Sequence, residues 1–156
     1  MSHTAKVLTV SDGVASGHRD DTGGRGLAQH LATNGFEVID HAVIPDGRES
    51  VAEALSAMAE GYCGLIATTG GTGFGPRDLT PEGTSDVLDR EAPGLAESMR
   101  AISPFGRLSR GRAGTIGSAL VINLPGSPRG AIEQIDAVID VLGHALDLLA
   151  GTDRTH

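Results

Sequence analysis

Four short runs of mainly apolar residues recur along the chain, and turn-forming residues follow each of them. The runs are rich in β-branched residues and have the length of single strands. They predict buried strands over residues 5–10, 36–44, 64–69 and 119–124.

Between these runs, apolar positions recur at spacings of three and four residues, which is the period of a helix with one buried face. The segments predicted to be helical are 24–34, 50–61, 80–91, 94–103 and a last helix that begins after Ser127. The last helix has the longest apolar stripe, formed by Ile132, Ile135, Ile139, Leu142, Leu146 and Leu149.

Residues suited to cap a helix precede three of these segments. Ser50 and Glu53 have the spacing of a capping box. Thr80 is expected to cap the next helix, with Pro81 at its first position. Ser127 is expected to cap the last helix.

The alternation of strands and helices predicts an α/β fold, with a mainly parallel sheet and helices on both of its faces. Residues 104–118 are rich in Gly and Arg and predict a loop or a small hairpin. Since no linker, repeat or low-complexity segment interrupts the pattern, we expect residues 1–156 to form a single domain.

Composition and charge exclude several classes of protein. Only 3% of residues are aromatic, so the core is expected to be aliphatic. The formal net charge of −8 argues against a nucleic-acid or anionic-membrane surface. No apolar stretch is long enough to span a bilayer. Because Cys63 is the only cysteine, no internal disulfide can form, and we expect this residue in the core. The first residues do not resemble a secretion signal, which favours a cytoplasmic location.

The candidate chemistry lies in the loops after the predicted strands, because ligands of open α/β sheets bind beyond the carboxyl ends of the strands. SDG contains Ser11 and Asp12, and IPDG contains Asp46. GGTG covers residues 70–73, and LPGSP contains Gly126 and Ser127. Glycines in such loops allow the backbone to approach a ligand and to direct N–H groups at an anion.

Asp78 is unexpected in a loop that attracts anions, unless a cation accompanies the ligand. Mg²⁺ is held by one or two carboxylates together with phosphate oxygens, so Asp46 and Asp78 are candidate ligands of one ion. The alternative is that both acids are turn and cap residues. We include Arg77 among the substrate-binding candidates because it lies in the same loop; no lysine follows the glycines, so this is not a P-loop.

The motifs LTVSDG, IPDG, GGTGFGPRDLTPEGT, LSRGRAG and INLPGSPRG, in this order, resemble the MogA/MoaB family of molybdenum-cofactor biosynthesis. The resemblance extends over about residues 5–150. It implies a three-layer α/β/α sandwich with a mainly parallel, mixed central sheet, and assembly as a homotrimer.

The resemblance also implies a function. Active members of the family use Mg-ATP to adenylylate the terminal phosphate of molybdopterin and release pyrophosphate, which prepares the pterin for a downstream MoeA-type metal insertase. By motif, the catalytic acids and Mg²⁺ ligands correspond to Asp46 and Asp78. The implied substrate-binding residues are Ser11, Asp12, Gly70, Gly71, Thr72, Gly73, Ser118, Gly126 and Ser127.

Several alternatives remain open at this point. The chain departs from the family at Ile116, where relatives often have a basic residue, so the cluster of Arg107, Arg110 and Arg112 either replaces a phosphate contact, forms a solvated loop or contacts another subunit. The protein is either the adenylyltransferase or a MoaB-like molybdopterin-binding protein without turnover. A nucleotide hydrolase on a related fold is a third hypothesis.

Overall fold

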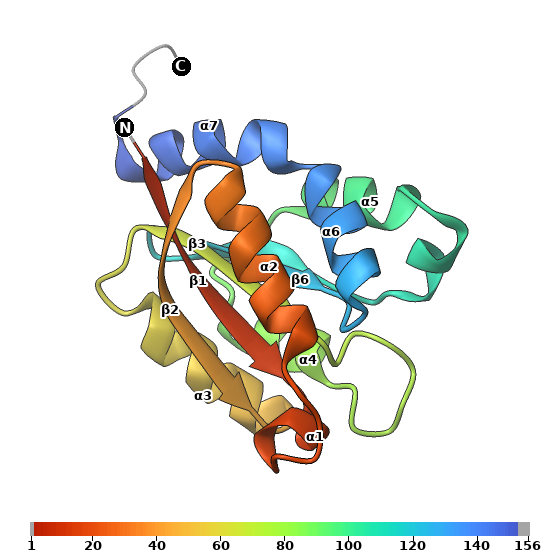
Figure 1. The fold of residues 1–156 in the computed structure, drawn as a ribbon. Coiled ribbons are helices and arrows are strands. Elements are labelled where there is room, and N and C mark those ends of the chain that lie inside the picture. Colours follow the sequence, from red (N-terminus) through yellow and green to blue (C-terminus); the bar gives the residue numbers. More distant parts are fainter. Residues whose placement is uncertain (1, 153–156) are drawn as a thin grey trace.

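The computed structural model describes residues 2–152, which form one six-stranded sheet covered by helices on both faces (Figure 1). The strand order is β2-β1-β3-β6-β5-β4. β1, β2, β3 and β6 run parallel to one another, whereas β5 is antiparallel to both of its neighbours. The strands are β1 (His3–Val10), β2 (Phe36–Ile44), β3 (Gly64–Thr69), β4 (Arg90–Glu91), β5 (Ala113–Ile116) and β6 (Ala119–Leu124). The mainly parallel, mixed sheet is confirmed.

The four predicted strands are present, three of them with the predicted ends. β1 begins two residues earlier than predicted, at His3. Every residue of β3 and β6 is buried, because helices cover both faces of these central strands. Such strands appear in the sequence as continuous apolar runs, which explains why they were easy to locate.

The helices form two layers. They are α1 (Asp12–Ala15), α2 (Thr22–Thr33), α3 (Arg48–Ala59), α4 (Thr80–Val87), α5 (Pro93–Ala101), the 3₁₀ helix η1 (Pro104–Leu108), α6 (Pro128–Asp136) and α7 (Ile139–Ala150). Residues of α2, α5, α6 and α7 share one aliphatic core with alternate residues of the strands. The other face is covered by α3 and α4. The result is the three-layer α/β/α sandwich that the resemblance implies.

The predicted last helix is wrong in one respect, because it is two helices. α6 ends at Asp136 and α7 begins at Ile139, with the buried Val138 between them. The predicted apolar stripe continues across the break, since Ile135, Leu142 and Leu146 are all buried. Periodicity therefore identified the buried face but not the interruption.

Two of the three predicted caps are also wrong. α3 begins at Arg48 after Gly47, and the Ser50 hydroxyl donates to the carbonyls of Pro45 and Gly47 instead of capping the helix. Thr80 lies within α4, where its hydroxyl has a different partner described below. The third cap is confirmed: Ser127 Oγ accepts the Gly130 N–H at the start of α6.

The segment that gave no clear pattern, residues 104–118, forms η1 and then β5, which makes a hairpin with β6. The predicted hairpin is thus correct for the second half of this segment.

The prediction for Cys63 is wrong, because this residue is exposed just before β3. Among residues 2–152, no helix is both long and apolar enough to cross a membrane.

Asn123 connects the central strands to the helical layer that contains α4. Its side chain is fully buried and donates to the hydroxyls of Thr68 on β3 and Thr84 on α4, both at 3.1 Å. Its Oδ1 accepts the Arg112 N–H at 3.0 Å. All of these groups lose a partner if the amide is removed.

We predict that Asn123→Leu, which keeps the branched shape of the side chain, lowers the free energy of unfolding by at least about 2 kcal/mol, because a buried polar group left without a partner costs about 1–3 kcal/mol. Asn34→Leu, at the exposed end of α2, is the control and should cost less. Urea unfolding measures both. Equal losses would show that the buried network adds nothing beyond a surface hydrogen bond.

Candidate active site

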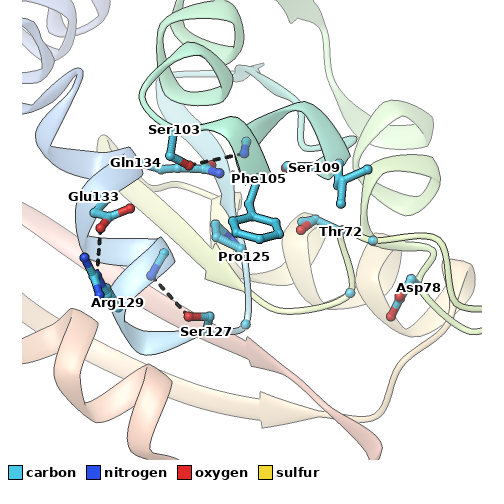
Figure 2. A pocket seen from close by; sticks show the side chains of 16 residues that line it. Thr72, Asp78, Ser103, Phe105, Ser109, Pro125, Ser127, Arg129, Glu133 and Gln134 are labelled. Carbon is cyan, nitrogen blue, oxygen red and sulfur yellow. Dashed lines mark hydrogen bonds and ion pairs between the residues drawn. The ribbon is translucent and has the colours of Figure 1, made fainter.

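Two cavities lie beside each other at the carboxyl ends of the parallel strands. The larger has a volume of about 760 Å³ and extends between η1 and the start of α6 (Figure 2). The smaller, of about 210 Å³, is bounded by the ends of β1 and β3 and the start of α2. Gly71, Asp78 and Gly126 line both cavities. These three residues therefore mark the place where two ligands can meet.

The loops after β1 and β2 are joined by a reciprocal pair of hydrogen bonds. The Asp12 N–H donates to Asp46 Oδ2 at 2.9 Å, and the Asp46 N–H donates to Asp12 Oδ1 at 3.1 Å. Ser11 caps the short helix α1 by accepting the Val14 N–H. The two predicted acids of these loops thus lie together, and each fixes the backbone of the other.

Arg77 fixes this pair from the glycine-rich loop. Its guanidinium donates to both carboxylate oxygens of Asp12, at 2.6 and 3.0 Å, and to the Asp46 carbonyl at 2.9 Å. Asp12 and Arg77 therefore position Asp46, and their charged groups are already paired with each other.

Gly70 and Gly71 allow the chain to turn where three elements meet. Their φ angles are +105° and +70°, in the region that favours glycine. A Cβ on Gly70 would lie 2.2 Å from the Val10 carbonyl oxygen, and one on Gly71 would lie 2.3 Å from Thr80 Oγ1. The Thr80 hydroxyl donates to the Gly70 carbonyl at 2.9 Å. These glycines are consequently required by the fold itself.

The same loop leaves three successive N–H groups available for a ligand. Within residues 2–152, the N–H groups of Gly71, Thr72 and Gly73 donate no hydrogen bond. All three residues line the larger cavity. Adjacent free N–H groups at a cavity wall are typical of a site that binds an anion.

Asp78 lies beside Gly73 and Gly75, whereas Asp46 lies beside Gly71. Its Oδ2 accepts the Gly75 N–H at 2.9 Å, which folds the loop back on itself. A Cβ on Gly73 would lie 3.1 Å from this oxygen, and one on Gly75 would lie 2.8 Å from it. Small residues at both positions therefore leave room for the carboxylate.

Arg110 holds the outer part of the loop in place. Its guanidinium donates to the carbonyls of Gly73 and Asp78, at 2.9 and 2.6 Å, and to Glu82 at 2.5 Å. Arg112 pairs with Glu91, and Arg107 donates to the Pro104 carbonyl. The arginine cluster is thus not one functional unit, and Arg110 supports the backbone around Asp78.

Each of the two predicted catalytic acids is anchored through one oxygen only. Oδ2 accepts a backbone N–H in both Asp46 and Asp78, whereas Oδ1 accepts no hydrogen bond from the part of the chain that the structure describes. Asp46 Oδ1 points towards Gly71, since it lies 3.1 Å from the position of a Cβ there. The free oxygens leave both acids able to bind a cation.

Electrostatics at Asp46 also favour a cation. Burial raises the pKa of the Asp46 carboxyl, the N–H of Asp12 opposes this effect, and the negative charges of Asp12 and Asp78 raise the pKa further. By contrast, the hydrogen bonds from Arg77 lower the pKa of Asp12. The charge of Arg77 lowers the pKa of Asp46 only in part, so the negative charge of Asp46 is less compensated by the protein than that of Asp12.

The residues present fit Mg²⁺ better than a metal held by protein ligands alone. Among residues 2–152, no group of three or more His, Cys, Asp or Glu side chains is arranged to hold a metal ion. Mg²⁺ needs fewer, because it is usually bound by one or two carboxylates together with substrate phosphates and water. Asp46 and Asp78 supply that number.

The structure separates one predicted residue from all the others. Ser118 lies in the turn between β5 and β6, beside Ala119, which pairs with Gly64 at the beginning of β3. This is the opposite end of the sheet from both cavities. The resemblance implied a contact for Ser118, but in this chain β6 carries the backbone away from Ser118 before it reaches Gly126 and Ser127.

Residues that line the larger cavity were also missed from the sequence. They include Phe105 and Leu108 on η1, and Glu133 and Gln134 on α6. The predictions followed loops after strands, and these residues lie on helices. The one available signal was the scarcity of aromatic residues, which makes an aromatic side chain in a Gly- and Arg-rich segment unusual.

Comparisons with known proteins agree with this arrangement. A family model described as "Probable molybdopterin binding domain" matches residues 6–144. The molybdopterin adenylyltransferase of Helicobacter pylori (strain ATCC 700392 / 26695) is 35% identical over 152 residues, which cover 93% of this chain and 86% of the relative. The molybdopterin adenylyltransferase of Escherichia coli (strain K12) is 38% identical over 149 residues, which cover 90% of this chain and 75% of the relative.

A solved structure extends the likeness to the whole fold. The molybdopterin biosynthesis enzyme MoaB from Thermus thermophilus superposes with a TM-score of 0.89 and 46% identity. The match covers 96% of this chain and 97% of that chain.

The opposite pKa shifts of Asp46 and Asp12 predict opposite effects on stability. A raised carboxyl pKa means that the Asp46 charge costs stability at about pH 7 and that this cost is lost as the pH falls through the folded-state pKa. Asp46→Asn without added metal should therefore be at least as stable as the wild type at about pH 7, and its advantage should shrink towards about pH 4.

Asp12→Asn is the matched control. A lowered pKa means that the Asp12 charge stabilises the fold at any pH above the unfolded value near 3.8. This variant should be less stable than the wild type, by an amount that stays constant down to about pH 4. Thermal melting at several pH values tests the pair, and a less stable Asp46→Asn would contradict the assignment.

Proposed function

Because the chain belongs to the family of probable molybdopterin-binding domains, we propose that it is a molybdopterin adenylyltransferase. It transfers AMP from ATP to the terminal phosphate of molybdopterin and releases pyrophosphate. The observation that carries this proposal is that Gly71 and Asp78 line both cavities, while Asp46 lines the smaller one with its Oδ1 beside Gly71.

The two cavities suit the two substrates. The smaller is lined by four aspartates, Asp20, Asp21, Asp46 and Asp78, and by one cation, Arg19. This excess of negative charge suits a nucleotide that arrives with its own cation. The larger cavity ends at the free N–H groups of Gly71, Thr72 and Gly73, which are placed to bind a phosphate of the second substrate.

The chemistry requires no nucleophile from the protein. An oxygen of the molybdopterin phosphate attacks the α-phosphorus of ATP, a new P–O bond forms, and the bond to the bridging oxygen of pyrophosphate breaks. The protein holds both phosphates in line and binds the charge that develops on their oxygens. The N-terminus of α6, with Gly126 and Ser127, adds a favourable dipole on the same side.

Asp46 and Asp78 would hold Mg²⁺ through their free oxygens. When bound, the ion neutralises phosphate charge and polarises the α-phosphorus. Asp12 and Arg77 act through Asp46, whose backbone and carboxylate they position. The proposed binding set therefore contains Ser11 and residues 70–73, 126 and 127, but not Ser118.

Further parts of the proposal are supported by the resemblance of the motifs to the MogA/MoaB family. We propose that residues 1–156 act as a single domain; residues 1 and 153–156 lie outside the part that the structure describes. We also propose that the protein assembles as a homotrimer in the cytoplasm. The adenylylated product would pass to a MoeA-type metal insertase.

One experiment separates the enzyme from the two alternatives. The protein is incubated with molybdopterin and Mg-ATP, and the adenylylated pterin and pyrophosphate are quantified. A MoaB-like binding protein would retain molybdopterin without forming either product. A hydrolase would release phosphate or pyrophosphate from ATP when no pterin is present.

We predict that Asp46→Asn and Asp78→Asn each lower the rate of AMP transfer by at least about 100-fold, because each removes a negative charge that holds the ion. Both variants should also lose any rise in melting temperature that Mg²⁺ and ATP produce in the wild type. Asp40→Asn, an exposed position on β2, is the control. If either variant keeps wild-type turnover, its metal role is refuted.

The oligomeric state is tested separately. Light scattering at micromolar concentration should give the mass of three chains of 15.9 kDa each. A monomeric mass would remove the trimer from the proposal and leave the proposed chemistry untouched.

A further inference from the structure

The wall of the larger cavity opposite the glycine-rich loop is formed by η1 and α6, which supply an exposed aromatic ring and a buried amide (Figure 2). Neither residue has a role in the chemistry described so far. Both line the larger cavity.

Gln134 is only 5% exposed, and its side chain lines the cavity. Within residues 2–152, the side-chain amide of Gln134 forms no hydrogen bond. The amide atoms are also not completely enclosed by the protein. Its amide therefore keeps some access to solvent, has no partner among the described residues and belongs to the cavity lining. Such an amide is available to form hydrogen bonds with a ligand.

Phe105 is 81% exposed, although it is one of only three phenylalanines in the chain. η1 holds it in place, because Ser103 Oγ accepts the Gly106 N–H and Gly106 packs against the Arg100 carbonyl. In Figure 2 the ring lies over Pro125 at the cavity. An aromatic face presented in this way is suited to stack on a flat ring.

Glu133 precedes Gln134 on α6 and lines the same cavity. Its Oε1 accepts Arg129 Nε at 2.9 Å, while Oε2 accepts no hydrogen bond from the described residues. The cavity thus offers a carboxylate acceptor next to an amide that can both donate and accept.

We infer that Phe105 stacks on the pterin ring of molybdopterin and that Gln134 and Glu133 recognise its edge. This assignment rests on the proposed function. The pyrimidine edge of a pterin presents an amino group, a ring N–H and a carbonyl, which match a carboxylate acceptor and an amide donor. Adenine presents no ring N–H on that edge and no carbonyl, so the larger cavity selects the pterin and excludes the base of ATP.

The test measures binding of molybdopterin by fluorescence and, separately, the KM for ATP. Gln134→Leu and Phe105→Ala should each weaken molybdopterin binding by about tenfold, because stacking on an aromatic side chain contributes about 1–3 kcal/mol and tenfold corresponds to about 1.4 kcal/mol. The KM for ATP should change by less than about twofold, which is under about 0.5 kcal/mol.

Matched controls are available in the chain. Phe74→Ala removes another exposed phenylalanine that does not line the cavity, and Gln29→Leu changes an exposed glutamine of α2. Both should leave molybdopterin binding unchanged. Since Phe105 is exposed, Phe105→Ala should keep the wild-type melting temperature, so it remains informative even if Gln134→Leu fails to fold.

A second measurement addresses the edge contacts. The wild type should bind 2-amino-4-oxopteridine more tightly than lumazine, which lacks the amino group, and Glu133→Gln should reduce that preference. A rise in the KM for ATP with unchanged molybdopterin binding would assign the cavity to adenine and overturn the inference. Unchanged values for both substrates would overturn it as well.

Binding is measured without turnover, so an inactive wild type that still binds molybdopterin through Phe105 and Gln134 would refute the proposed function and leave this inference standing.

Discussion

The close approach of β1, β3 and α4 at Gly70 and Gly71 is the constraint on which the rest of the site depends. No side chain fits at either position, because the Val10 carbonyl and the Thr80 hydroxyl already occupy the space. This approach leaves three N–H groups of cavity-lining residues without a partner among residues 2–152 and brings Asp46 to one side of the turn. The backbone at these glycines therefore packs the elements of the fold together and also lines the site where we propose that the ligand binds.

The architecture was predictable because its physical causes are local. β3 and β6 are buried on both faces, so their sequences are uniformly apolar and have clear ends. The break between α6 and α7 was not predictable, since the apolar stripe continues through Val138 without interruption. The Ser50 cap failed for a related reason: the same hydroxyl has nearby carbonyls that compete for it.

The candidate site was predictable to the extent that parallel strands bring their following loops together. That rule placed Asp12, Asp46 and Asp78 at one edge of the sheet. It could not identify Phe105 or Gln134, because η1 and α6 reach the cavity through tertiary packing that leaves no fixed spacing in the sequence. Ser118 was assigned through the family motif alone, and in this chain it lies at the end of the sheet opposite the cavities.

Arg110 has a consequence for how the two halves of the site move. Its N–H donates to the Thr72 carbonyl, and its side chain donates to the carbonyls of Gly73 and Asp78. Arg110 follows η1 by two residues, so it connects the segment that carries Phe105 to the loop that carries Asp78. A ligand that shifts η1 must therefore either displace the loop around Asp78 as well or break these hydrogen bonds.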